Sequence, residues 1–164
     1  MNQIPNRKSP RANFHNYSKG IFFVTICTKD KQHFFGKIVN GKMIYTQIGR
    51  YTLTQLQEIS QHYPYAEVFD MVVMPNHIHL MIEIFDRNTR THEPCVPTER
   101  TALSVVIGGF KRAVTLFARR NDMIFAWQSR YHDHIIRGIN DFNRIGAYIR
   151  DNIGKWEEDC FYQM

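Results

Sequence analysis

The sequence predicts an α+β domain built on an antiparallel sheet, and three observations lead to this fold class. Several short segments are β-branched, aromatic or alternately apolar, as strands are, and they are separated by segments with the three- and four-residue periodicity of amphipathic helices. A hairpin signal, Asn40-Gly41, follows the first strand. At 164 residues and 43% apolar side chains, the chain has room for one domain with a substantial core. We expect residues 1–164 to form that single domain.

The first half of the chain predicts a strand, a hairpin and a helix. Residues 20–28 are rich in β-branched and aromatic side chains, which favours a buried strand. Residues 34–38 and 42–48 flank the hairpin signal and are expected to pair. Residues 49–62 have a helical pattern that Pro64 ends.

The middle of the chain predicts a second hairpin and a long helix. Residues 67–74 are almost continuously apolar, and Pro75-Asn76 then marks a turn. The strand that follows is expected to pair with them antiparallel. After a polar, proline-containing loop, an amphipathic helix opens at Thr98, with its apolar stripe at Leu103, Val106, Ile107, Phe110, Val114 and Phe117.

The C-terminal third predicts one more strand and one more helix. Residues 125–137 have the composition of a strand, and Asn140 or Asp141 can cap a helix over residues 142–152. Without the first hairpin and this last helix, the order is that of a ferredoxin-like βαββαβ sandwich. Two helices would cover one sheet face, and the other face would stay open for chemistry.

The strand after the second turn carries a His-x-His motif. Side chains two apart on a strand point to the same face, so His77 and His79 lie together, while Ile78 and Leu80 face the core. Two imidazoles on a rigid strand form half of a divalent-metal site. Taken alone, the motif fits equally well two polar residues on an open sheet face, so a third ligand and a nucleophile are needed.

The last predicted helix offers both groups. Tyr148 and Asn152 are four residues apart and share a helix face. If that face packs on the sheet, the Asn152 amide oxygen can join the imidazoles on a cation, and the Tyr148 hydroxyl can lie beside whatever the cation binds. Tyr131 is a second candidate nucleophile. It precedes His132 and His134, for which we expect a structural or DNA-contacting role because no further ligand cluster accompanies them.

The charge distribution favours a polyanionic partner. The net charge is +6, and no acidic residue precedes Asp30, so residues 1–19 are expected to be a flexible basic arm that contacts phosphates. The long helix adds cations on its polar side. The candidate DNA-binding residues are Arg7, Lys8, Arg11, Lys111 and Arg112.

The cysteines and the lack of long apolar runs indicate the compartment. Cys27, Cys95 and Cys160 are odd in number and form no Cys-x-x-Cys pair, so they are expected to be reduced thiols. No run approaches a membrane span, and no secretory signal is apparent. We expect a cytoplasmic, nucleoid-associated protein with no membrane partner.

Three motifs occur in order along the chain: Met74-Pro-Asn-His-Ile-His79, Trp127-Gln128 leading into residues 130–137, and Tyr148-Ile-Arg-Asp-Asn152. With them, residues 19–156 resemble the HUH-type single-tyrosine transposases, especially the REP-associated tyrosine transposases. The resemblance implies His77 and His79 as metal ligands and Tyr148 as nucleophile. It implies Asn152 as third ligand, where relatives carry Gln or Asn, although Ile153 stands where the family often has Pro.

The resemblance further implies nicking and rejoining of hairpin-containing single-stranded DNA, such as REP-like palindromes or transposon ends, through a 5′-phosphotyrosine. The ligand set favours Mg²⁺ or Mn²⁺ over a thiolate-bound zinc ion. The enzyme could act as a monomer or a homodimer, with its tyrosine in the same or the partner subunit. The alternatives are a nucleic-acid-binding module without catalysis and a metallohydrolase that uses water without a covalent intermediate.

Overall fold

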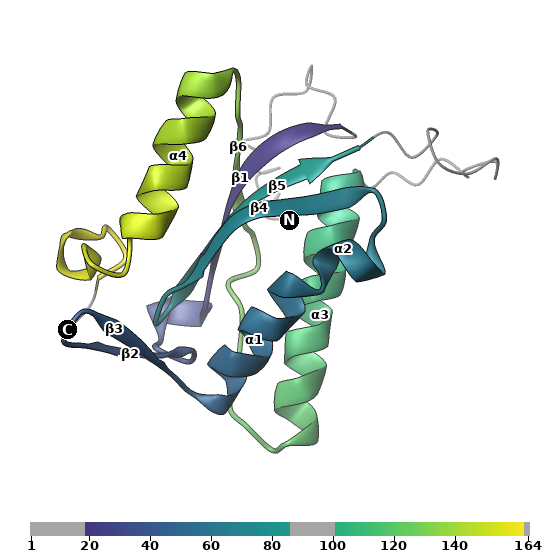
Figure 1. Ribbon diagram of the computed structural model, residues 1–164. Helices are drawn as coiled ribbons and strands as arrows, with labels where there is room; N and C mark the ends of the chain where they lie inside the picture. Colours follow the sequence, from purple (N-terminus) through teal and green to yellow (C-terminus); the bar gives the residue numbers. More distant parts are fainter. Residues whose placement is uncertain (1–18, 86–100, 163–164) are drawn as a thin grey trace, which may run out of the picture.

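The computed structural model describes residues 19–85 and 101–162, and its core is a four-stranded antiparallel sheet. The strands are β1 (Gly20–Cys27), β4 (Ala66–Val73), β5 (His77–Ile84) and β6 (His132–Ile135). They lie in the order β4-β5-β1-β6, with each neighbouring pair antiparallel (Figure 1). This order, with helices after β1 and β5, is the ferredoxin-like arrangement, and the predicted α+β class is confirmed.

The inserted hairpin is also confirmed, with shorter strands than predicted. It consists of β2 (Gly36–Val39) and β3 (Lys42–Tyr45) and forms a separate two-stranded sheet. Asn40 and Gly41 have φ angles of 52° and 68°. Two consecutive positive φ values are what the two-residue hairpin turn requires, and Asn-Gly adopts them readily.

The helix boundaries differ from the predicted ones because two threonines cap the helices. Helix α1 (Gln47–Gln57) begins at Thr46, whose hydroxyl accepts from the Gly49 amide at 3.1 Å. A separate short helix, α2 (Ile59–His62), follows, so the single helix predicted here is broken at Glu58. Helix α3 (Ala102–Arg120) begins after Thr101, which caps the Ser104 amide at 3.2 Å, whereas Thr98 lies outside the described residues.

The long strand predicted over residues 125–137 is wrong, because only His132–Ile135 pair as β6. The preceding segment makes an isolated bridge between Trp127 and Thr28. It is held instead by its side chains: the Trp127 indole donates to the Lys111 carbonyl at 3.1 Å, and its ring packs beside Phe35 and Phe110.

The two sheet faces carry separate cores. Helices α1, α2 and α3 cover one face, where Ile78, Leu80 and Ile82 are fully buried (Figure 1). Helix α4 (Ile139–Asp151) covers part of the other face and packs Ile145 and Ile149 in a smaller core. The sequence led us to expect an open second face, and this prediction is wrong because α4 packs on it.

Helix α4 also begins differently from the prediction. Its N-cap is Gly138, at φ +82°, without a side-chain cap, so neither Asn140 nor Asp141 has the predicted capping position. Asp141 lies in the first turn, where its carboxylate binds His134 Nε2 at 3.0 Å. This contact links β6 to α4.

Candidate metal and tyrosine site

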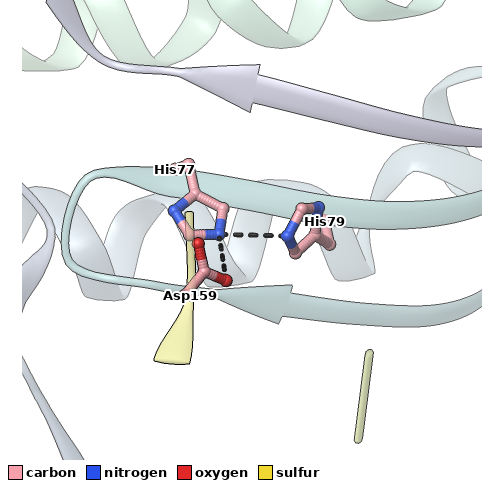
Figure 2. A group of neighbouring side chains, drawn as sticks. All are labelled: His77, His79 and Asp159. Atoms are coloured by element: carbon pink, nitrogen blue, oxygen red, sulfur yellow. Dashed lines mark hydrogen bonds and ion pairs between the residues drawn. The ribbon is translucent and has the colours of Figure 1, made fainter. Parts of the chain in front are cut away.

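His77 and His79 lie side by side on β5, with their Nε2 atoms 3.1 Å apart (Figure 2). They are 0% and 2% exposed, because the α4 side of the sheet is covered. Burial is the main cause that lowers the pKa of His77 to about 2 and that of His79 to about 4. Both imidazoles are therefore neutral at pH 7, which is the form that binds metals.

The far nitrogen of each imidazole is held by a polar neighbour. His77 Nδ1 lies 2.8 Å from Asn76 Oδ1, and the Asn76 amide nitrogen donates to the Lys31 and Phe161 carbonyls. Those two bonds fix the amide orientation, so His77 Nδ1 donates and its Nε2 carries the lone pair. Thr25 Oγ1 lies 2.9 Å from His79 Nδ1. Metal-binding histidines are commonly oriented in this way.

The spacing of the two Nε2 atoms fits one shared cation. Two nitrogens each about 2.1 Å from an ion, at right angles to one another, stand about 3.0 Å apart. The observed 3.1 Å matches that separation. The described residues thus form a preorganised two-nitrogen donor set.

Tyr148 extends from α4 to the same place. Its Oη lies 3.2 Å from His79 Nε2, and its ring packs edge-on against Phe23. The residue is 43% exposed, so one side of it faces solvent. Burial, and then the charge of Asp159, raise the pKa of Tyr148. The protein groups alone keep the phenol protonated.

Asn152 has an unsatisfied buried oxygen at this site. It is 3% exposed, and its amide nitrogen donates to Asp159 Oδ2 at 3.2 Å. Its Oδ1 has no hydrogen-bond partner among the described residues. A buried carbonyl oxygen without a partner costs about 1–3 kcal/mol, and a cation beside it would offset that cost. Ile153 in place of Pro leaves Asn152 in a helical conformation after Asp151.

Asp159 is a site residue that the sequence reasoning missed. It follows a short 3₁₀ helix, η3 (Trp156–Glu158), and its Oδ2 lies 3.8 Å from His77 Nε2 (Figure 2). Potential ligand atoms of His77, His79 and Asp159 lie within 4.8 Å of one another. Asp159 Oδ2 also accepts from Tyr148 Oη at 3.5 Å. In the sequence it is one of three acidic residues in the tail, and no spacing distinguishes it.

The residues after Asp159 cover the imidazoles. The Phe161 ring centre is 4.5 Å from that of His77, and the Phe161 amide donates to Asp159 Oδ1 at 2.7 Å. Lys31 Nζ donates to the Cys160 carbonyl at 3.3 Å. This cover explains the burial of a site that the sequence predicts on an open face.

A comparison with a known protein bears on the fold that carries this site. A solved structure described as a REP-associated tyrosine transposase bound to a REP hairpin matches with a TM-score of 0.61 at 17% identity, over 92% of this chain and 74% of that one. The chain has the HUH-type tyrosine transposase fold. The resemblance seen in the sequence motifs is thereby confirmed at the level of fold.

A sequence relative and a second solved structure are also similar to the chain. It belongs to the family of a Haemophilus influenzae protein described as uncharacterized, which is 36% identical over 171 residues, 97% of this chain and 94% of the relative. A proposed transposase from Deinococcus radiodurans R1 matches with a TM-score of 0.48 at 15% identity, over 88% of this chain and 97% of that one. No protein-family model matches the sequence.

The other predicted site residues that the structure describes in this HUH-fold protein lie away from the histidines. Lys111 and Arg112 belong to α3, on the opposite sheet face, and Lys111 Nζ donates to the Gln128 carbonyl at 2.7 Å. Tyr131 packs against the core on that same face. The arm residues Arg7, Lys8 and Arg11 lie outside the described residues.

Two further predictions from composition concern the thiols and membrane spans. Cys27 and Cys160 are free thiols, and Cys95 lies outside the described residues. Within residues 19–85 and 101–162, no helix combines the length and the apolar character needed to cross a bilayer.

Proposed function

We propose that this protein nicks and rejoins single-stranded DNA through a covalent 5′-phosphotyrosine intermediate, with Tyr148 as the nucleophile. The observation that carries the proposal is the 3.2 Å distance between Tyr148 Oη and His79 Nε2, beside a second imidazole and an unpaired amide oxygen. A nucleophile held this close to a phosphate-binding centre needs little reorganisation before it attacks.

The proposed cofactor is Mg²⁺ or Mn²⁺, held by His77 Nε2, His79 Nε2 and Asn152 Oδ1. The proposed ligands are imidazole nitrogens and an amide oxygen, with no thiolate. Such a ligand set suits Mg²⁺ or Mn²⁺ better than it suits a structural zinc ion, which is usually bound by thiolates. When bound, the cation polarises a phosphate oxygen and offsets the charge that develops during transfer. Asp159 Oδ2 is the second candidate for the third ligand, because it lies 3.8 Å from His77 Nε2.

The chain's own residues supply the attacking group and a proton acceptor. Tyr148 Oη forms a bond to phosphorus as the bond from phosphorus to the 3′-oxygen breaks, which leaves a 5′-phosphotyrosine and a 3′-hydroxyl. The phenol proton passes to Asp159 Oδ2, its hydrogen-bond acceptor at 3.5 Å, and the departing 3′-oxygen takes a proton from solvent. The transferred phosphodiester energy is retained, so rejoining needs no nucleotide triphosphate.

Substrate entry requires a movement of the cover. The Phe161 ring lies over His77, whose exposed fraction is zero, so a phosphate reaches the imidazoles after this ring moves aside. Residues 160 and 161 are held by the Lys31 bond to the Cys160 carbonyl, the Asn76 bond to the Phe161 carbonyl, the Phe161 amide bond to Asp159, and the Lys31 ammonium over the Phe161 ring.

The proposed substrate is hairpin-containing single-stranded DNA. The structural relative is described as bound to a REP hairpin, and the basic arm (Arg7, Lys8, Arg11) with Lys111 and Arg112 is proposed to contact backbone phosphates. A binding module without catalysis is less well supported, because such modules stack bases on exposed sheet aromatics, and here buried histidines occupy the sheet face.

The test is incubation with a panel of labelled single-stranded hairpins and Mn²⁺, followed by denaturing gel electrophoresis. A labelled band that migrates with the protein after boiling in detergent is expected. Cleaved DNA without such a band would indicate the metallohydrolase, which uses water. Intact DNA across the panel would contradict both enzymes.

Thr25→Val tests the orientation of His79. The change removes the hydroxyl beside His79 Nδ1 and nearly preserves the volume, so the affinity for Mn²⁺ should fall about 10–100-fold. Isothermal titration measures it. Thr52→Val is the matched control, because its buried hydroxyl on α1 has no described partner and lies on the other sheet face. An equal loss in both variants would contradict a specific role for Thr25.

A further inference from the structure

A pocket lies beyond the end of β1. Its volume is about 510 Å³, within the range of about 300–1,000 Å³ that small ligands occupy. Two segments line it: the 3₁₀ turn η1 (Lys29–Lys31) and residues Trp127, Gln128 and Ser129. Trp127-Gln128 belongs to one of the three sequence motifs, and the proposed chemistry leaves it without a role.

The pocket walls are fixed to the sheet. The Lys29 amide donates to the Ala126 carbonyl at 2.9 Å, and the Gln128 amide donates to the Cys27 carbonyl at 2.9 Å. The Trp127 side chain is anchored to α3 through Lys111. The Gln128 and Ser129 side chains are exposed, so their polar groups are available to a ligand.

Three lysines meet here with little negative charge. Lys29 and Lys31 line the pocket, and Lys111 Nζ reaches its wall at the Gln128 carbonyl. Within the described residues, none of the three lysines makes an ion pair. Lys31 Nζ donates to the Cys160 carbonyl and lies over the Phe161 ring. Lys111 Nζ donates to the Gln128 carbonyl and lies over the Trp127 ring. Asp30 is the acidic residue in the lining. Gathered cations with neutral partners suit an anionic ligand.

The pocket is connected to the histidines through Lys31. Cys27, at the end of β1, stands opposite His77 in the strand register. The Lys31 carbonyl accepts from Asn76, the residue that orients His77. The Lys31 ammonium lies against Cys160 and Phe161, which cover the site. A DNA strand that leaves the histidine site on this side would pass Lys31 first.

We propose that this pocket binds the nucleotide next to the scissile phosphate, with Lys29 and Lys31 on its phosphate and with Trp127, Gln128 and Ser129 around its base. The inference rests on the proposed function, since it assigns one subsite of the same DNA strand. An aromatic wall and basic side chains are the usual means of holding single-stranded nucleic acid. Exposed Gln and Ser groups can hydrogen-bond the base edge.

Tryptophan emission tests occupancy of the pocket. The chain has two tryptophans, so Trp156→Phe leaves Trp127 as the reporter. In the full chain carrying Trp156→Phe and Tyr148→Phe, with EDTA present, a short mixed-sequence single strand should quench this emission. A fully paired duplex of the same length should not, because its bases are stacked inside. If neither the single strand nor the duplex quenches the emission, or if both quench it equally, the proposal is overturned.

Binding variants test the lysines. Lys29→Ala/Lys31→Ala should weaken single-strand binding at least about tenfold and reduce the salt slope by about 0.7, the value for the one phosphate that the two lysines are proposed to share. Lys37→Ala/Lys42→Ala on the β2–β3 hairpin removes the same charge from exposed positions and is the control. Equal losses in the two double variants would overturn the assignment to this pocket.

The outcomes separate the two proposals. The Trp127 quenching and the effect of the lysine variants need neither the metal nor the tyrosine hydroxyl. If both effects are absent while the covalent band forms normally, only the nucleotide subsite is refuted. If both effects are present and no hairpin gives a covalent band, the proposed catalysis is refuted and the subsite is supported.

Discussion

His77→Ala is expected to abolish both Mn²⁺ binding and DNA nicking, and His79→Ala should do the same. Each imidazole supplies one of two nitrogens that stand 3.1 Å apart. A single remaining nitrogen with an amide or carboxylate oxygen cannot hold the ion in a fixed position. Isothermal titration with Mn²⁺ and the gel assay measure the two losses, and both should reach the detection limit.

In these variants, a loss of metal binding must be distinguished from a loss of folding. His77 is fully buried and bonded to Asn76, so its removal leaves an unpaired acceptor and should cost about 1–3 kcal/mol of stability. Wild-type protein in EDTA keeps every side chain and should lose nicking equally. His62→Ala, at an exposed histidine of α2, should retain activity. Full cleavage in EDTA would refute the metal site.

Tyr148→Phe is expected to eliminate the covalent adduct while Mn²⁺ and DNA binding persist. The substitution removes one oxygen, and the ring can keep its packing on Phe23. Loss of a nucleophile should reduce adduct formation by about 10³-fold or more. Quantified gel bands, with Mn²⁺ titration on the same preparations, separate chemistry from binding.

Tyr131→Phe is the matched control for that experiment. Tyr131 packs on the opposite sheet face, so the adduct should form at close to the wild-type level. An adduct that survives in Tyr148→Phe and disappears in Tyr131→Phe would show that the catalytic helix is misassigned.

The sequence predicts the features that follow from periodicity. Alternation along β5 puts His77 and His79 on one face and Ile78 on the other, and the structure has this arrangement. The four-residue spacing likewise brings Tyr148 and Asn152 to one end of α4, with both beside Asp159. The βαββαβ order follows in the same way from the order of the periodic segments.

Features set by packing between distant segments are not visible in local patterns. The burial of the histidine face depends on α4 and on Phe161, which is 84 residues from His77, and no local periodicity indicates that contact. Asp159 joins the site through the same tail contact. Residues before β6 have strand-like composition, but Trp127 packs against α3 and the segment does not extend the sheet.

The central claim is that Tyr148 becomes linked to DNA, and peptide mapping of the adduct tests it most directly. Trypsin cleavage after Arg144 and Arg150 releases residues 145–150 with Tyr148, and cleavage after Arg130 and Arg137 releases residues 131–137 with Tyr131. After nuclease trimming, mass spectrometry should find a 5′-nucleotide phosphate on residues 145–150. The same modification on residues 131–137, or cleaved DNA with no modified peptide, would contradict the account.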